Sequence, residues 1–245
     1  MKKFKVVIPA RHKSSRFPGK PLTKILGKEM ILHVAERALG AVDRSQLIIA
    51  TDSMQIANVV RDNGFAIKLT SDQHPTGTDR VWEAIKDDNI DFVINIQGDE
   101  PMFHPEDLVQ IIKAKIDFPD HVVNGMADLM IDENESNVNI PKVVHDESGT
   151  LLYMSRQAIP GSKANEELSI PFKKQVCLYG FNKEHLEAYA NFGRKSNLEQ
   201  FEDIEILRFF EVGIPVKMIT LMGNTKAVDI PEDVPEVEEL MRAAY

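Results

Sequence analysis

The sequence predicts an α/β protein built around a mostly parallel sheet. Short apolar runs alternate with amphipathic stretches of helical periodicity through the first half of the chain, an order typical of βαβ units. The length of 245 residues suits one large domain, or one with a modest subdomain. Several apolar runs also end abruptly in charged or small polar residues, as strands do at the ligand-binding edge of an open α/β sheet.

This alternation defines the elements of the first half. Short apolar runs bounded by polar residues predict strands at 4–8, 47–50, 66–69 and 92–96. Stretches whose apolar residues fall on one helical face predict helices at 31–41, 54–62, 78–85 and 105–116. In the first of these helices, for example, Val34, Ala35 and Ala38 share one face.

The second half of the chain has a different character. The segment 143–153, with Glu147-Ser148-Gly149 at its centre, predicts a β-hairpin, and Asn134–Asn139 predicts a polar surface loop. The remaining expected elements are a strand at 176–181, a helix at 198–212, a strand at 216–221 and a helix at 234–244. We therefore expect an α/β core from residues 1–120 and 205–245, interrupted by a smaller subdomain at 121–204.

Composition excludes several classes of protein. Apolar residues make up 43% of the chain and charged residues 27%, and no apolar run approaches the ~20 residues of a membrane span. The single Cys177 cannot form an intramolecular disulfide, which suits the reducing cytoplasm. A sequence pI near 5.3, without an extended basic face, argues against nucleic-acid binding.

Basic charge is concentrated at the start of the chain. Nine of the 29 Lys and Arg residues lie in the first 28 positions, which contain no acid, although the whole chain has a formal net charge of -9. The loop after the first strand contains Arg11, Ser14, Arg16 and Lys20, and such a loop places cations and backbone N–H groups around a polyphosphate. It matches neither a Walker A sequence nor a GxGxxG fingerprint. The alternative is a solvated turn held by its proline and glycine.

Two acids stand where a metal ion would suit them. Asp99 emerges shortly after the apolar run 92–96, where an isolated carboxylate needs a cation nearby. Facing the basic loop, it would be a ligand for Mg²⁺, which prefers hard oxygen ligands and bridges to phosphate. The alternative for Asp99 is a helix N-cap or a salt bridge to Arg11 or Lys20. Asp229, just before the last helix, is a second candidate ligand, and its alternative is a helix cap.

Other polar motifs are less informative. Thr76-Gly77-Thr78-Asp79-Arg80 opens a helix and offers small polar groups to a base or ribose, but it is also an ordinary capping sequence. The seven histidines show no metal-ligand spacing, and the sequence has no G-x-S-x-G nucleophile elbow. Cys177 lies inside an expected strand, which favours a core position over a reactive thiol.

Together these segments resemble the bacterial CMP-sugar synthetases that activate 3-deoxy-manno-octulosonate (Kdo), the sugar acid that links lipid A to the core of lipopolysaccharide. The resemblance covers almost the whole chain. Its motifs are IPARHKSSRFPGKPL at 8–22, ATD at 50–52, TGTDR at 76–80, NIQGDEP at 95–101, KVV at 142–144, YMSRQAIP at 153–160, YGF at 179–181, IEILR at 204–208 and VDIPED at 228–233. The first of these motifs, followed in order by QGDEP and VDIPED, is highly specific.

The resemblance implies a fold, a reaction and a set of site residues. The fold would be a nucleotide-diphospho-sugar transferase-like (Rossmann-like) three-layer sandwich, whose smaller subdomain completes the sugar pocket and forms a homodimer contact. CTP would react with an octulosonic sugar acid in the presence of Mg²⁺, and the catalytic residues would be Lys20, Arg11 and Asp99. The nucleotide would be held by Arg11, Ser14, Arg16, Lys20, Thr76, Thr78 and Gln97. The sugar would be held by Gln97, Arg156, Gln175, Tyr179, Ile206 and Asp229, and the metal by Asp99 and Asp229.

The departures from the family pattern lie in the sugar half. Where the family usually reads RHLGIYGY, this chain reads KQVCLYGF at 174–181, so the expected His is Gln175 and the final Tyr is Phe181. Ile206 stands where the family usually has a pocket glutamine. Replacing a His that can be cationic with neutral Gln suits an acceptor bearing an ammonium group, such as 8-amino-3,8-dideoxy-manno-octulosonate, because like charges repel. The alternative is neutral drift in an enzyme that uses ordinary Kdo.

Other functions share parts of this pattern. A GT-A-like glycosyltransferase has a similar α/β nucleotide fold and an acidic metal site, but it usually carries a DxD sequence, whereas here Asp99-Glu100-Pro101 stands alone. A related CMP-sugar synthetase for another sugar acid would keep the same nucleotide motifs. A non-catalytic nucleotide-binding regulator would have no need of Lys20, Asp99 and Asp229 together.

Overall fold

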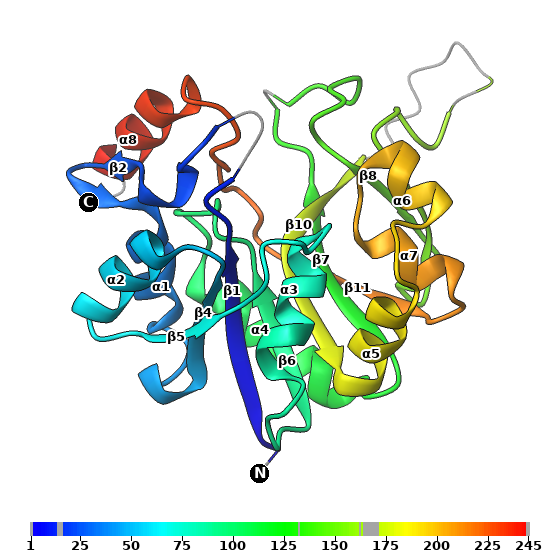
Figure 1. Cartoon of the computed structure of the whole chain (residues 1–245). Coiled ribbons are helices and arrows are strands. Elements are labelled where there is room, and N and C mark those ends of the chain that lie inside the picture. The colour runs from blue at the N-terminus through cyan, green and yellow to red at the C-terminus, as the bar shows by residue number, and fades with distance from the viewer. Residues whose placement is uncertain (1, 14–16, 132, 162, 164–171, 244–245) are drawn as a thin grey trace.

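The computed structural model describes residues 2–13, 17–131, 133–161, 163 and 172–243, and it shows a mixed sheet between two layers of helices (Figure 1). The strands of the large sheet are β1 (Phe4–Ala10), β4 (Leu47–Thr51), β5 (Ala66–Leu69), β6 (Phe92–Ile96), β7 (Val122–Asp128), β8 (Lys142–His145), β9 (Leu151–Ser155), β10 (Lys173–Asn182) and β11 (Val216–Thr220). A small second sheet pairs β2 (Lys24–Ile25) with β3 (Lys28–Glu29). The helices are α1 (Met30–Ala38), α2 (Met54–Asp62), α3 (Gly77–Ile85), α4 (Pro105–Asp117), α5 (Lys183–Asn191), α6 (Asn197–Glu202), α7 (Ile206–Glu211) and α8 (Asp233–Ala243), with short 3₁₀ turns η1 (Lys20–Leu22) and η2 (Arg44–Gln46).

The sheet is parallel from β6 to its edge strand β5. Its strands follow the order β11-β7-β10-β6-β1-β4-β5, and β8 and β9 extend it from one end of β10. β1 pairs in parallel with both β4 and β6, β4 with β5, and β7 with β11. β10 is antiparallel to its neighbours β6 and β7. The mostly parallel α/β sandwich predicted from the sequence is therefore confirmed.

Two apolar layers hold the sandwich together. α1, α2 and α4 cover one face of the sheet, and α3, α5 and α7 cover the other (Figure 1). Successive strand residues point to opposite faces, so the adjacent Val6 and Val7 belong to different layers. Burial on both faces explains why the strands read as nearly continuous apolar runs. No helix in the described part of the chain has the length and apolar character needed to cross a membrane.

Polar segments meet at one edge of the sheet because the parallel strands before them end together. Ala10 at the end of β1 pairs with Thr51 at the end of β4, and β6 lies on the other side of β1. Beyond these ends, the Asp52 carboxylate accepts a hydrogen bond from the backbone N–H of His12 (3.2 Å) and pairs with the guanidinium of Arg80 (3.3 Å). The loop after β1 is thereby attached to the loop after β4.

The C-terminal segment returns to the same edge through a third, smaller apolar cluster. α8 packs there with Ile25, Met30 and Val228. The backbone N–H of Val228 also donates to the carbonyl of Asp99 (3.0 Å), which follows β6. This packing brings Asp229 to the edge of the sheet where Asp99 lies.

A bulge in β10 alters the direction of its side chains. Val176 pairs with Gly125 of β7 and Tyr179 pairs with Asn124, so the two residues between them have no counterpart in β7. The amide of the fully buried Asn124 donates to the carbonyls of Val176 (2.9 Å) and Leu178 (3.0 Å). Because buried carbonyls need a hydrogen-bond partner, Asn124 stabilises the bulge.

The structure departs from the sequence-based expectations in three places. The expected helix 198–212 is two helices, because Asp203 adopts a left-handed conformation (φ 51°) between α6 and α7. β7 and α5 were not among the elements expected from the sequence. β7 and β10 also belong to the large sheet, so a division at residues 120 and 205 does not separate this sheet from a second one. Long-range pairing of β10 with both β6 and β7 is the physical reason.

Gly125 tests the packing around the bulge. A Cβ added there would collide with the side chain of Leu221 and lie 3.1 Å from Cβ of Val176. We expect Gly125→Ala to lower the free energy of unfolding by about 1–3 kcal/mol, because overpacking forces neighbours to shift. Urea denaturation measures the change. The matched control is Gly161→Ala, whose added Cβ meets nothing within 4 Å, and an equal loss in both variants would contradict the explanation.

Candidate active site

A large cavity opens at the carboxyl ends of the parallel strands, with a volume of about 1240 Å³. One side is lined by residues 9–11, 97–100, 223–227, 229 and 230 and by α8. The other side is lined by the polar loop before β8 (residues 130, 133, 134, 137 and 139–141), by β10 and by residues 203–205 at the break between α6 and α7. Elements that are far apart in the sequence therefore contribute to one site, as in other open α/β sheets.

Lys20 lies at the centre of the first side. Its ammonium group donates to Oδ2 of Asp99 (2.7 Å) and to the carbonyl of Val228 (2.8 Å), and it lies 3.9 Å from Oδ1 of Asp229. Gly19 makes this possible with a left-handed φ of 73°, which turns the loop so that its N–H donates to the carbonyl of His12 (2.9 Å). The salt bridge that was the alternative for Asp99 is present, and it places both candidate metal ligands beside one cation.

Asp99 and Asp229 form a donor set that suits Mg²⁺. No group of three or more His, Cys, Asp or Glu side chains among the described residues is arranged to hold a metal ion. Mg²⁺, however, is commonly bound through one or two carboxylates together with substrate phosphates, so two aspartates at the cavity fit its chemistry. Both side chains are accessible, at 28% for Asp99 and 41% for Asp229.

Glu100 adds a third carboxyl group close to these two. Burial and the neighbouring charge of Asp99 raise the pKa of Glu100 to about 7, although the hydroxyl of Thr225 donates to it (3.1 Å) and opposes this shift. At neutral pH its carboxyl therefore carries less than a full negative charge. The sequence motif contained Glu100, but its chemistry depends on burial that the motif does not reveal.

The basic loop is only partly described by the structure. Arg11 lies at the cavity, and its side chain is exposed. Ser14 and Arg16, which the resemblance assigns to the nucleotide, lie outside the described residues. Arg80, which had no expected role, also lines the cavity and is 3% exposed. Burial lowers the pKa of Arg80, while its partner Asp52 opposes this effect.

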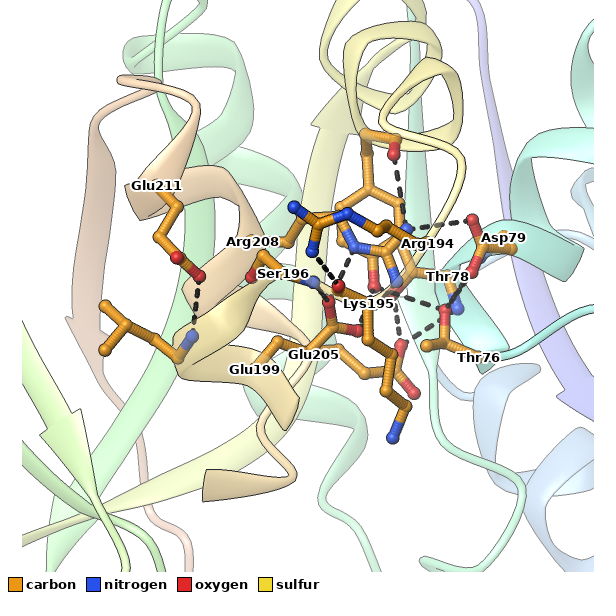
Figure 2. A network of polar contacts seen from close by, with 12 residues as sticks. Thr76, Thr78, Asp79, Arg194, Lys195, Ser196, Glu199, Glu205, Arg208 and Glu211 are labelled. Atoms are coloured by element: carbon orange, nitrogen blue, oxygen red, sulfur yellow. Dashed lines mark hydrogen bonds and ion pairs between the residues drawn. The ribbon is translucent and has the colours of Figure 1, made fainter. Parts of the chain in front are cut away.

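The first turn of α3 separates the two threonines that were assigned to the nucleotide. Thr76 caps the helix and lines the cavity. Thr78 does not line it: its hydroxyl donates to Oε2 of Glu205 (2.5 Å; Figure 2), as does its N–H (2.9 Å). The N–H of Gly77 donates to Oε1 of Glu205 (3.1 Å). Glu205 thus neutralises the partial positive charge at the N-terminus of α3, which would otherwise attract an anion. Burial raises the pKa of Glu205, and these hydrogen bonds oppose the shift.

The residues assigned to the sugar do not all reach the cavity. Gln97, Gln175 and Tyr179 line it. The amide of Gln175 donates to Oδ1 of Asn124 (3.0 Å) and contacts the hydroxyl of Tyr179 (3.4 Å), so the bulge in β10 sets its position. Ile206, in contrast, is 1% exposed, packs in the apolar layer of α7 and is not part of the cavity wall.

Arg156 lines the cavity but has several partners within the protein. Its guanidinium donates to the carbonyls of Glu202 (2.5 Å), Val138 (2.9 Å) and Asp203 (3.0 Å). It therefore attaches the polar loop before β8 to the break between α6 and α7. Before a sugar carboxylate can form a bidentate contact with Arg156, some of these hydrogen bonds must be exchanged.

An ion pair on the same side of the cavity was not anticipated. The ammonium group of Lys174 donates to both carboxylate oxygens of Glu133 (2.6 and 2.7 Å). Glu133 directly precedes the segment Asn134–Asn139, which the sequence predicted as a surface loop, but Glu133, Asn134, Asn137 and Asn139 all line the cavity. Cys177 also faces the cavity, and burial raises the pKa of its thiol, which disfavours the reactive thiolate.

Comparison with known proteins gives consistent results. The family model described as cytidylyltransferase matches residues 5–219. The chain is 38% identical over 243 residues to 3-deoxy-manno-octulosonate cytidylyltransferase of Parabacteroides distasonis, covering 95% of this chain and 96% of the relative. It is 36% identical over 239 residues to the mitochondrial 3-deoxy-manno-octulosonate cytidylyltransferase of Arabidopsis thaliana, covering 96% and 82%.

Solved structures extend this result. A CMP:2-keto-3-deoxy-manno-octonic acid synthetase complexed with CTP matches with a TM-score of 0.90 at 34% identity, over 99% of this chain and all of that one. A putative glucose-1-phosphate thymidylyltransferase from Bacillus anthracis matches with a TM-score of 0.69 at 14% identity, covering 98% and 95%, and supports the nucleotidyltransferase-like fold alone. The chain therefore belongs to the cytidylyltransferase family, as a member of its 3-deoxy-manno-octulosonate (CMP-Kdo synthetase) group.

Proposed function

We propose that this protein is a CMP-sugar synthetase that joins CMP from CTP to a 3-deoxy-octulosonic acid and releases pyrophosphate. The observation that carries the proposal is the meeting of Lys20, Asp99 and Asp229 at the cavity beside the basic loop. The similarity to a synthetase complexed with CTP supports the donor, and the curated relatives support a Kdo-type acceptor. Such a product would serve lipopolysaccharide core synthesis. A glycosyltransferase or a non-catalytic regulator lacks comparable support.

The reaction needs positioning and charge neutralisation more than covalent help from the protein. The anomeric hydroxyl oxygen of the sugar forms a bond to the α-phosphorus of CTP and loses its proton to solvent water. The bond from that phosphorus to the bridging oxygen breaks, and pyrophosphate carries the electron pair away. Lys20 and Arg11 would offset the charge that develops on the phosphates, because fixed cations stabilise such a transition state without reorganising. Gln97 and Thr76 would help hold the substrates in line.

Mg²⁺ completes the proposal. Asp99 and Asp229 would hold it, since both carboxylates lie close to Lys20 at the cavity. A bound Mg²⁺ supplies Lewis-acid charge stabilisation and lowers the pKa of a hydroxyl group that it binds. Lys20 occupies the space beside both carboxylates here, so its ammonium group and the metal would share them once the phosphates arrive.

The favoured acceptor is 8-amino-3,8-dideoxy-manno-octulosonate, with ordinary Kdo as the alternative. Support comes from Gln175, which is neutral where the resembled family usually has His, and which lines the cavity. Its amide is held by Asn124 and Tyr179, neither of which carries a positive charge. An ammonium group on the acceptor would meet less repulsion here than beside a cationic imidazole.

We also propose that the protein acts as a homodimer in the cytoplasm, where CTP is available. A candidate contact is the α6–α7 face, formed by Phe201 of α6, Phe210 of α7 and the adjacent Tyr153 of β9. Phe201 is 90% exposed, and the ring of Phe210 packs edge-on against Tyr153. An apolar face is complementary to a copy of itself, as a two-fold symmetric interface requires.

Asp99→Asn tests the metal and catalytic assignments. We expect turnover to fall by at least about 100-fold with the fold intact, because Asn keeps the shape but not the charge needed by Mg²⁺ and Lys20. Pyrophosphate release from CTP measures turnover, and circular dichroism checks the fold. The control is Asp128→Asn, which removes the same charge from a surface ion pair with Lys173 (2.7 Å) and should leave turnover unchanged. Near-normal turnover in Asp99→Asn would sink the metal assignment.

Gln175→His tests the acceptor. We expect the preference for the amino sugar over Kdo, expressed as the ratio of kcat/KM values, to fall about tenfold, and to fall further as the pH drops from 8 to 6 and the imidazole gains a proton. The control is Gln110→His on the exposed surface of α4. A strong preference of the unaltered protein for Kdo would refute the amino-sugar proposal and leave the cytidylyltransferase assignment in place.

Phe201→Glu tests the dimer contact. A charge placed in an apolar interface must be desolvated without a partner, so we expect the variant to sediment as a monomer while the parent sediments as a dimer. Analytical ultracentrifugation measures the mass of each. Met54→Glu is the control, because Met54 is 54% exposed on α2 and lies outside the α6–α7 face. A monomeric parent, or a dimeric Phe201→Glu variant, would contradict the proposed contact.

A further inference from the structure

A fully buried cation lies directly behind the cavity wall. Arg208 of α7 is 0% exposed, and its guanidinium donates to both carboxylate oxygens of Glu199 in α6 (2.7 Å each; Figure 2). It also donates to Oδ1 of Asp79 in α3 (3.1 Å) and to the carbonyl of Tyr189 in α5 (3.2 Å). Four helices are therefore joined through one side chain.

Tyr189 continues this connection to the cavity. Its ring centroid lies 3.6 Å from the guanidinium carbon of Arg208, and its hydroxyl donates to Oε1 of Glu199 (3.1 Å). The same hydroxyl contacts Oγ1 of Thr76 (3.2 Å), whose own hydroxyl donates to Asp79 (2.7 Å). Thr76 and Glu199 both line the cavity, so the tyrosine hydroxyl lies between two residues of its wall.

Stability alone does not explain this arrangement well. Two carboxylates and one guanidinium must be desolvated, and apolar replacements of such buried groups are often equally stable or better. The charged network instead fixes the relative positions of its members, because a planar guanidinium can donate to its partners in only a few arrangements. Here those partners are Asp79 in the first turn of α3 and Glu199 in α6, so the network fixes these two helices relative to one another.

We propose that Arg208 and Tyr189 are positioning residues for the nucleotide, acting through Thr76 and the first turn of α3. Neither touches the cavity. They hold the cap of α3 at a fixed place relative to α6, so the cavity wall is preformed before CTP binds. Binding then costs less free energy for ordering the side chains of the wall. The proposal rests on the proposed use of CTP, but not on the identity of the acceptor.

The first variant is Tyr189→Phe, which keeps the ring and removes only the hydroxyl. We expect the dissociation constant for CTP, measured by calorimetry without acceptor, to rise about fivefold, as befits one buried hydrogen-bond link, with the far-UV spectrum unchanged. Tyr153→Phe is the matched control. It also removes a hydroxyl that donates to a carboxylate, that of Glu202 (3.4 Å), but has no link to α3, and its CTP affinity should equal that of the parent.

The second variant is Arg208→Lys, which retains the charge but cannot reach Glu199 and Asp79 in the same way. We expect CTP binding to weaken at least tenfold at a temperature where circular dichroism shows a folded protein. Parental CTP affinity in either folded variant, or an equal loss in Tyr153→Phe, would overturn the positioning role. If the parent itself fails to bind CTP, the proposed function falls first, so the two failures are distinguishable.

Discussion

The ion pair between Lys20 and Asp99 is the contact on which the active-site edge depends. It joins the turn that ends the basic loop to the segment after β6, and the same ammonium group donates to the carbonyl of Val228. Three parts of the chain that are far apart in sequence therefore meet at one cation. Because both partners are partly removed from water, their attraction exceeds that of an exposed pair. The charge excess of the N-terminal segment thus has a structural use, in addition to the catalytic role that we propose for Lys20.

The opposite side of the cavity depends on irregular backbone. The bulge in β10 leaves carbonyls that Asn124 satisfies, and the break at Asp203 leaves carbonyls that Arg156 satisfies. Glu205, just after the break, accepts the hydrogen bonds of the first turn of α3. Each irregularity is tolerable only because a polar side chain replaces the lost backbone partner. The side of the cavity that we propose for the acceptor is therefore built from side chains that already have structural hydrogen-bond partners.

Regular elements were predictable where one period dominated the pattern. The strand 92–96 and the helix 54–62 have the bounds that the pattern predicts. The strand is buried on both faces and is therefore a continuous apolar run, whereas the helix is buried on one face and has apolar residues at helical spacing. β7 was not predicted because Asn124 and Gly125 interrupt its apolar run. Both residues contact the bulge in β10, which the local sequence does not reveal. The prediction of a single helix at 198–212 was wrong for a similar reason. The apolar periodicity continues across Asp203, so it does not reveal the left-handed backbone that ends α6 there.

The sequence by itself predicted a nucleotide donor, because Arg11 and Lys20 lie in the loop after the first strand and Asp99 lies shortly after the strand 92–96. The apolar runs of these strands are legible, and the helical connections between them favour a parallel order. Only the tertiary structure decided which motif residues reach the cavity. It directs Thr78 to Glu205 and buries Ile206 in the core, although both occupy family motif positions. The physical reason is that the direction of a side chain follows from helix breaks, bulges and hydrogen-bond partners contributed by remote segments, and local spacing does not encode these.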